Sequence, residues 1–164
     1  MPSIRKAEPA AAHEQRLLRL FEQQAEDLTH PRAVLANGNY DLWLAEDGEA
    51  LVGALLGTHM HVTSEGVVVD ATSSAAEVRG GVENLLVAAP HRRQGIGRAL
   101  METAESHYAV QGLAGMQLAA DADNVPARLL YESMGYRIIR EYVRTRAGVQ
   151  QPRISMAKQF PTHR

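Results

Sequence analysis

Apolar residues recur at helical spacing near the N-terminus of the chain. Between residues 13 and 28, leucine, phenylalanine and alanine return every three or four positions among glutamate and arginine, a pattern that predicts an amphipathic helix. We expect this helix to end before His30–Pro31, because proline disfavours the helical conformation of the residue that precedes it. Residues 32–36 can add one more helical turn, and residues 3–7 are a candidate short strand.

The next apolar segments predict a β-hairpin. Residues 40–45 and 50–56 lie on either side of the pair Asp47–Gly48, and an Asp-Gly pair between apolar runs is a strong signal for a tight turn joining antiparallel strands. The second strand can continue to residue 62. Residues 64–81 show no clear period, and the valines at 67–69 are their candidate edge strand.

Strands and helices alternate over the second half of the chain. We predict a strand at 82–88, a turn at 90–95, a helix at 96–110, a strand at 116–120, a helix that ends at Gly135, and strands at 136–145 and 154–159 joined by a loop at 146–152. This order predicts a mixed sheet with helices, an α/β (α+β) class, in one domain that comprises residues 1–164.

Composition narrows the class of protein. The chain has 164 residues, of which 45% are hydrophobic and 22% charged, as expected for a globular protein. Its formal net charge of −2 predicts no nucleic-acid partner and no membrane partner. The absence of cysteine excludes disulfides, thiolate metal sites and a cysteine nucleophile. The start of the chain lacks the apolar core of a signal peptide, so we expect a cytoplasmic protein.

A glycine-containing turn is the first candidate functional feature. Gly95 and Gly97 open the predicted helix directly after a strand, and Arg92 and Arg93 precede them. A helix N-terminus has unpaired N–H groups and a positive dipole end, and glycine lets an anion approach them, so the turn predicts a phosphate or pyrophosphate site. A structural turn with two solvated arginines is the alternative.

Two other nucleotide-binding motifs do not match this turn. A dinucleotide fingerprint needs a third glycine at position 100, where the chain has Leu100. A P-loop needs Gly-Lys followed by Ser or Thr, and the chain contains no such sequence.

Two segments together resemble a known family. Residues 86–100, Leu-Val-Ala-Ala-Pro-His-Arg-Arg-Gln-Gly-Ile-Gly-Arg-Ala-Leu, are similar to the acetyl-CoA-binding motif of the GCN5-related N-acetyltransferases: Arg or Gln, two residues, Gly, one residue, then Gly or Ala. Residues 124–136 resemble the family's second motif, an Asn, an Ala three positions later, a Tyr seven positions later, then Gly and an aromatic residue. One departure is Ala89, where the family often has proline; here the proline comes one position later.

The resemblance implies a fold and an activity. The implied GNAT acyl-CoA N-acyltransferase fold has a central mixed, mostly antiparallel sheet of six to seven strands flanked by helices. The implied activity is direct transfer of the acetyl group of acetyl-CoA to a primary amine of a small molecule or peptide. The alternative is a catalytically silent acyl-CoA-binding regulatory module of the same fold. A homodimer is a candidate assembly, because dimers are common in the family.

The resemblance also assigns roles to individual residues. Asn124 is similar to the residue that hydrogen-bonds the pantetheine arm, with a helix cap as its structural interpretation. Tyr131 resembles the general acid that protonates the thiolate, with a core position as its structural interpretation. The residues expected to bind acetyl-CoA are Leu86, Val87, Arg92, Arg93, Gln94, Gly95, Ile96, Gly97, Arg98, Asn124 and Tyr131. Backbone amides around Leu86 and Val87 are the implied oxyanion site.

An amine must lose a proton to attack, so the reaction favours a general base. Glu83, on the strand that holds the thioester in the family, is the leading candidate, acting through water; an exposed strand glutamate is the alternative. Some relatives place the base on the next strand, at the position of Ala119, which cannot act. Asp121 is a weaker candidate and a turn residue by its surroundings.

His59 and His61 are the remaining candidates, as ligands of a metal ion. Alternate residues of a strand share a face, so both histidines can point the same way. Two acidic residues, Glu65 and Asp70, follow in the region without a clear pattern. We interpret the pair as solvated residues on a strand, or as residues lining an acceptor pocket, and predict no metal site.

Overall fold

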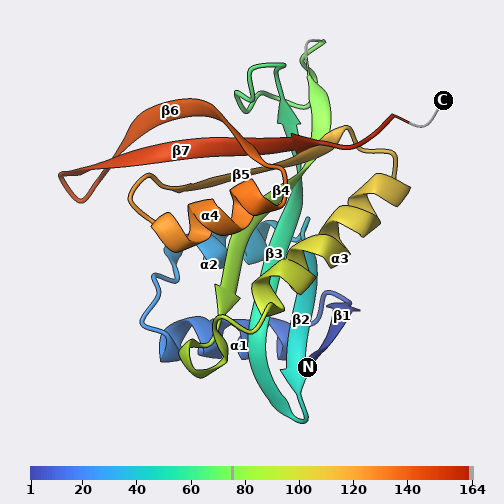
Figure 1. Cartoon of the computed structure of the whole chain (residues 1–164), viewed down its shortest axis with the longest axis vertical. Coiled ribbons are helices and arrows are strands. Elements are labelled where there is room, and N and C mark those ends of the chain that lie inside the picture. Colours follow the sequence, from blue (N-terminus) through green and yellow to red (C-terminus); the bar gives the residue numbers. More distant parts are fainter. Residues whose placement is uncertain (75, 163–164) are drawn as a thin grey trace. The chain divides into compact units, whose positions relative to one another are not determined.

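The computed structural model describes residues 1–74 and 76–162, which contain seven strands and four α-helices (Figure 1). The strands are β1 (Ser3–Ala7), β2 (Asp41–Asp47), β3 (Ala50–Val62), β4 (Glu77–Val87), β5 (Gly115–Asp121), β6 (Arg137–Arg146) and β7 (Val149–Gln159). They hydrogen-bond in the order β1-β2-β3-β4-β5-β7-β6. The predicted class, a mixed sheet of six to seven strands flanked by helices, is confirmed.

The chain divides into two compact units. The first comprises residues 1–58 and 82–107, and the second comprises residues 59–81 and 108–164. Strands β3 and β4 each have residues in both units. None of the helices in the described part of the chain is long and apolar enough to cross a membrane.

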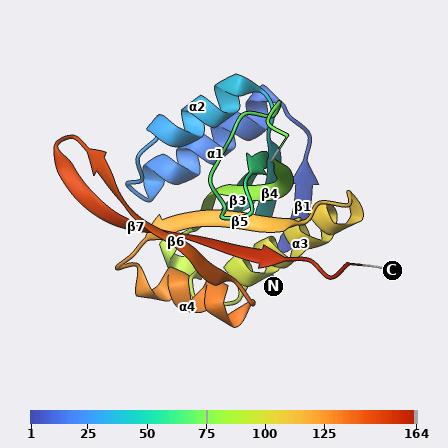
Figure 2. The same ribbon diagram turned by 90° about the horizontal axis from the view of Figure 1, so that it is seen from above.

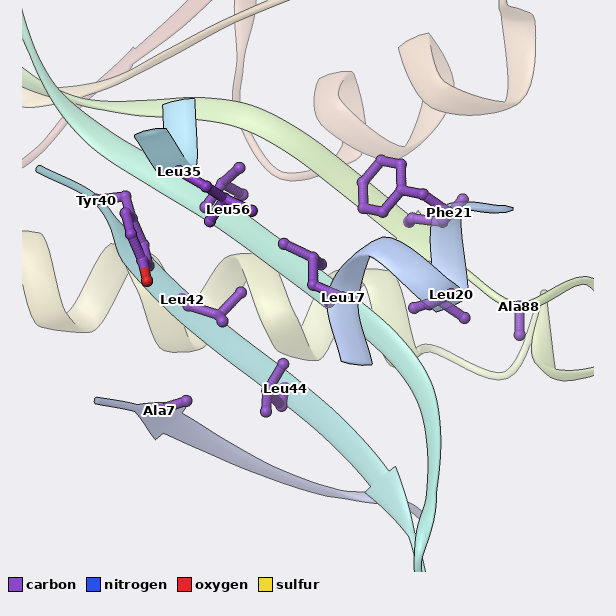
Figure 3. Packing of buried hydrophobic residues seen from close by; sticks show 12 residues of the cluster. Ala7, Leu17, Leu20, Phe21, Leu35, Tyr40, Leu42, Leu44, Leu56 and Ala88 are labelled. Atoms are coloured by element: carbon purple, nitrogen blue, oxygen red, sulfur yellow. The ribbon is translucent and has the colours of Figure 1, made fainter. Parts of the chain in front are cut away.

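In the first unit, helices cover both faces of the strands. Figure 2 shows α1 (Ala11–Gln23) and α2 (Thr29–Asn37) on one face and α3 (Ile96–Val110) on the other. Leucine and phenylalanine side chains of α1 and α2 pack with those of β2 and β3 into one cluster (Figure 3). Its members are Ala7, Leu17, Leu20, Phe21, Leu35, Tyr40, Leu42, Leu44, Ala54, Leu56, Leu86 and Ala88. This burial holds α2 against the sheet.

The helix predicted for residues 13–28 is confirmed up to Gln23 and wrong beyond it, because α1 ends there and a separate helix, α2, begins at Thr29. α1 ends at Gln23, and Ala25 adopts a left-handed φ of 56° that interrupts the helical path. The second helix begins at Thr29, whose amide donates to Asp27 Oδ1 over 2.7 Å. Pro31 therefore lies in the first turn of α2, where a missing N–H breaks no helical hydrogen bond.

β4 begins at Glu77, five residues before the predicted start, because a glycine pair conceals the strand pattern. A Cβ on Gly80 would lie 2.2 Å from Cδ2 of the Tyr108 ring, and one on Gly81 would lie 2.6 Å from Cγ of Met60. Glycine is needed there for close packing within the second unit. Glycine otherwise weakens a strand, so the sequence pattern points away from the observed structure.

The second unit contains a long hairpin, β6–β7, beside helix α4 (Val125–Ser133; Figure 1). The loop predicted at 146–152 is wrong, because β7 starts at Val149 and pairs with β6 from the pair Arg146–Val149 onward. Ala147 and Gly148, with φ of 48° and 75°, make the turn. Positive φ at both central residues matches the twist of paired strands, but Ala-Gly is not the Asn-Gly or Asp-Gly signal.

Glu46 of β2 forms ion pairs with residues of β1 and α1. We expect these ion pairs to stabilise the fold at neutral pH and to be lost in acid. The Glu46 carboxylate accepts from Arg5 Nε of β1 at 2.9 Å and from Arg16 Nη1 of α1 at 2.6 Å. These two guanidinium groups lower the pKa of Glu46 from 4.5 to about 2. A lowered pKa in the folded state stabilises above the unfolded value and is lost as pH falls from about 4.5 towards about 2.

We therefore expect Glu46→Gln to lower the free energy of unfolding at pH 7 by about 1 kcal/mol, since the pair is partly solvated. Urea titrations at pH 7, 4 and 3 measure this difference, which should shrink with acidification. A difference that stays constant across these pH values would contradict the ion-pair explanation. Glu49→Gln, an exposed change in the adjacent turn, is the control.

Candidate functional site

Two hydrogen bonds within the first unit hold the turn after β4. It contains a short 3-10 helix, Ala89–His91, followed by residues 92–95. Ala89 donates its N–H to Gln24 Oε1 at 2.8 Å, and Arg92 Nε donates to the carbonyl oxygen of Val87 at 2.9 Å. The path of the turn is thus set by α1 and by the end of β4.

The turn presents backbone N–H groups at the start of α3. Arg93 and Gly95 have left-handed φ of 61° and 82°, and alternation of backbone conformation in such turns creates anion-binding concavities. The bond from Ala99 N to the carbonyl of Gly95 closes the first helical turn, so the N–H groups of residues 96–98 precede the helical ladder. This is where an anion gains most from the helix dipole.

The space beside Gly95 is open. Apart from its two chain neighbours, the nearest heavy atom to a Cβ built on this glycine would be Met1 Cε, at 3.9 Å. Residues 92–95 are all exposed. A phosphate group can therefore approach the amides here.

Close packing fixes the direction of α3. The Ile96 and Leu100 side chains are buried, and a Cβ on Gly53 of β3 would lie 3.2 Å from Ile96 Cγ2 and 3.2 Å from the carbonyl oxygen of Leu86. The helix start is thus held against β3 and β4. Because the Ile96 side chain is in the core, only its backbone is available to a ligand.

Glu83 lies in a hydrogen-bonded cluster that the sequence analysis did not foresee. Oε1 accepts from Thr58 Oγ1 at 2.7 Å, and Oε2 contacts His30 Nε2 at 2.8 Å. Its side chain is 16% exposed, whereas that of His30 is 55% exposed. Burial opposes ionisation of the carboxyl, but hydrogen bonds from His30 and Thr58 and the charge of His30 outweigh it, so the pKa of Glu83 is lowered.

The histidine partner of Glu83 had no sequence signal. His30 and Glu83 are separated by 53 residues, and no spacing rule connects them. Asn84, next to Glu83, was also missed: within the described part of the chain, its Oδ1 is buried and has no hydrogen-bond donor. Because successive residues of a strand point to opposite faces of the sheet, this amide lies on the other face from Glu83.

Tyr131 lies in α4 and Asn124 immediately precedes this helix, both in the second unit. Tyr131 is 8% exposed, its ring lies edge-on to Tyr136 with centroids 6.0 Å apart, and burial raises its pKa to about 12. Asn124 caps the helix, because its Oδ1 accepts from the Ala127 N–H at 3.3 Å. Asp121, the weaker base candidate, is ion-paired with Arg153 at 2.8 Å.

The histidines at 59 and 61 do not form part of a metal-binding group among the described residues. His59 Nε2 is hydrogen-bonded to Gln111 Oε1 at 2.9 Å, and its ring packs edge-on against Tyr108 at 5.7 Å. His59 is therefore a packing and hydrogen-bonding residue of the second unit.

Comparison with known proteins places these observations in a family. Residues 3–136 match the sequence model described as the acetyltransferase (GNAT) family. The chain belongs to this family. N-acetyltransferase family 8 member 3 of Rattus norvegicus is 29% identical over 115 residues, which is 70% of this GNAT chain and 46% of the rat protein. The chain thus spans about half the length of that curated relative.

Solved structures share the fold of this GNAT chain. NAA60 of Arabidopsis thaliana in complex with acetyl-CoA superposes with a TM-score of 0.75 at 18% identity, covering 96% of this chain and 100% of that one. The ribosomal-protein-S18-alanine N-acetyltransferase of Escherichia coli gives a TM-score of 0.73 at 20% identity, covering 99% and 96%. At these identities the likeness establishes the GNAT fold.

Proposed function

We propose that this GNAT chain transfers the acetyl group of acetyl-CoA directly to a primary amine. The observation that carries the proposal is the turn at residues 92–97, which presents helix N-terminal amides, a left-handed Gly95 and open space in a chain of this family. The amine nitrogen attacks the thioester carbonyl carbon, an N–C bond forms, the C–S bond breaks, and one proton passes from the amine to the departing thiolate.

In this proposal the turn binds the pyrophosphate. The N–H groups of residues 94–98 donate to phosphate oxygens, and Arg93 adds positive charge. Arg92 stabilises the turn by donating a hydrogen bond to the carbonyl oxygen of Val87, and its guanidinium adds positive charge. Amides around Leu86 and Val87 stabilise the oxyanion that develops on the carbonyl.

Tyr131 of α4 and Asn124, its N-cap residue, complete the assignment to acetyl-CoA. Asn124 hydrogen-bonds the pantetheine arm, a role compatible with capping α4 because an amide offers both acceptor and donor groups. Tyr131 protonates the thiolate, and its pKa of about 12 keeps the phenol in the donating form at neutral pH. Glu83 is the general base that takes the proton of the amine through a water molecule.

The acceptor in this proposal is a primary amine of a peptide, a protein or a small molecule. The bacterial structural relative is named for an alanine of a ribosomal protein, which supports including protein amines among the candidates.

Two assays test the proposed function, and the first measures ligand binding. At a concentration of about 100 Kd, acetyl-CoA should stabilise the protein by about 2.7 kcal/mol, seen as a rise in Tm, whereas NAD should give no comparable shift. Stabilisation by ATP alone would overturn the assignment to acetyl-CoA.

The second assay measures free thiol released with a panel of amines. The chain contains no cysteine, so a thiol-reactive dye reports coenzyme A without protein background. Thiol release that depends on one class of amine supports the transferase. Tight acetyl-CoA binding without release for any amine would identify the regulatory module instead.

A further inference from the structure

We infer that His30 is the group that takes the proton from the acceptor amine and that Glu83 is the positioning residue that orients it. The inference rests on the proposed function and replaces the water molecule between the amine and Glu83 by a side chain of the protein. It assigns a catalytic role to a residue of α2, an element outside both sequence motifs.

The position of His30 is fixed by packing on both sides of the contact. His30 is the second residue of α2, and the next residue, Pro31, is buried together with Leu35 of the same helix. Glu83 is held at its other oxygen by Thr58 of β3. Both carboxylate oxygens are therefore engaged, and Oε2 points at the imidazole over 2.8 Å.

Exposure distinguishes the two members of the pair. The Glu83 side chain is 16% exposed and that of His30 is 55% exposed. An incoming amine on a peptide or small molecule thus meets the imidazole more readily than the carboxylate. Both oxygens of Glu83 are already engaged by Thr58 and His30, which leaves the carboxylate poorly placed to take the proton itself, whereas imidazole is the side chain best suited to accept a proton near neutral pH.

The chemistry follows from the contact of Nε2 with a carboxylate. A neutral imidazole that donates its Nε2–H to Glu83 carries its lone pair on Nδ1. As the amine nitrogen bonds to the thioester carbon, its proton moves to Nδ1, and the carboxylate stabilises the imidazolium that forms. Tyr131 gives its proton to the leaving thiolate, and solvent returns a proton from the imidazolium to the phenolate, so the overall reaction balances.

The central test is His30→Gln, which retains a side-chain N–H that can donate to Glu83 but cannot accept a proton. We expect kcat to fall about 10²- to 10³-fold, the KM for acetyl-CoA to stay within twofold, and the acidic limb of the pH–rate profile to be lost.

Glu83, Asp27 and Arg32 are the charged groups to consider in that profile; Asp27 accepts from the Thr29 amide, and Arg32 is exposed. His13→Gln is the matched control, because His13 bonds to the backbone carbonyl of Glu8 instead of a carboxylate.

Two further variants separate chemistry from structure. His30→Ala should recover at least tenfold of its lost rate with added imidazole, because the site is half exposed and a small base can enter it. Glu83→Gln keeps an acceptor for Thr58 and should lower kcat about 10-fold or more without changing the Tm shift produced by acetyl-CoA. A folding defect in any variant would appear in that Tm measurement.

The outcomes distinguish this inference from the proposed function. Wild-type turnover combined with an unchanged rate and pH profile in His30→Gln would overturn the role of His30 and leave the transferase intact. A His30→Ala variant that binds acetyl-CoA but gains nothing from imidazole would also count against it. A wild type that transfers acetyl to no amine would overturn both.

Discussion

Replacing Tyr131 with phenylalanine lowers kcat about 10²- to 10³-fold in the transferase that we propose, with little change in acetyl-CoA binding. The substitution removes one hydroxyl from a side chain that is 8% exposed, and it leaves the ring packed against Tyr136. General acid catalysis contributes about 10²- to 10⁴-fold, so loss of the donor should appear mainly in kcat.

The pH dependence of kcat in the wild type and in Tyr131→Phe also tests the acid role. Burial raises the pKa of Tyr131 to about 12, so the phenol stays protonated, and able to donate, up to about pH 11. The wild type should therefore show no loss of kcat from this group between pH 7 and 10, and the ratio of wild-type to Tyr131→Phe rates should be constant across that range.

A tyrosine of the same unit provides the control for this experiment. Tyr142→Phe removes a hydroxyl from the β6–β7 hairpin and should leave kcat within twofold of the wild type. Mass spectrometry of the acetylated acceptor gives both rates directly. Equal turnover by wild type and Tyr131→Phe at pH 7 and pH 9.5 would exclude the acid role and leave Tyr131 as a core residue.

Gly95→Asp is expected to weaken acetyl-CoA binding by about 10²-fold or more. The open space beside Gly95 would then hold a carboxylate at the position proposed for the pyrophosphate, and two like charges about 4 Å apart near a protein surface repel by about 4 kcal/mol at an effective dielectric constant of 20. An acidic residue near a helix N-terminus is itself favourable for the helix. The loss should thus affect binding far more than folding.

Gly38→Asp is a closely matched control for this variant. Gly38 has a φ of 81° against 82° for Gly95, and a Cβ there meets nothing within 4 Å. Both substitutions impose the same left-handed backbone on aspartate, so their effects on Tm should be similar. Isothermal titration with coenzyme A measures the difference; equal Kd values for the two variants would mean that the pyrophosphate lies elsewhere.

The sequence predicted best where the structure is determined locally. The helix expected at residues 96–110 is observed with the same bounds, because its apolar face and glycine-rich start are close together in the chain. The hairpin at Asp47–Gly48 and the helix ended by Gly135 were also predicted correctly, since left-handed turn positions favour glycine.

Predictions from the sequence failed where packing overrides local preference. The break between α1 and α2 depends on a left-handed Ala25, which no propensity favours, and is compensated by burial of Pro31 and Leu35. The start of β4 contains Gly80, which is accepted because the Tyr108 ring occupies the space of a side chain. In each case, contacts in the folded protein offset a backbone conformation or a residue that is unfavourable locally.

The sequence by itself thus determined the class of this protein and the turn proposed to bind the donor. A helix start with a left-handed glycine depends on residues only a few positions apart, so its anion-binding character can be inferred from spacing alone. Only the tertiary structure decided which side chains surround Glu83. Thr58 and His30 come from β3 and α2, 25 and 53 residues away in the chain, and they meet because each element buries its own apolar face against the sheet.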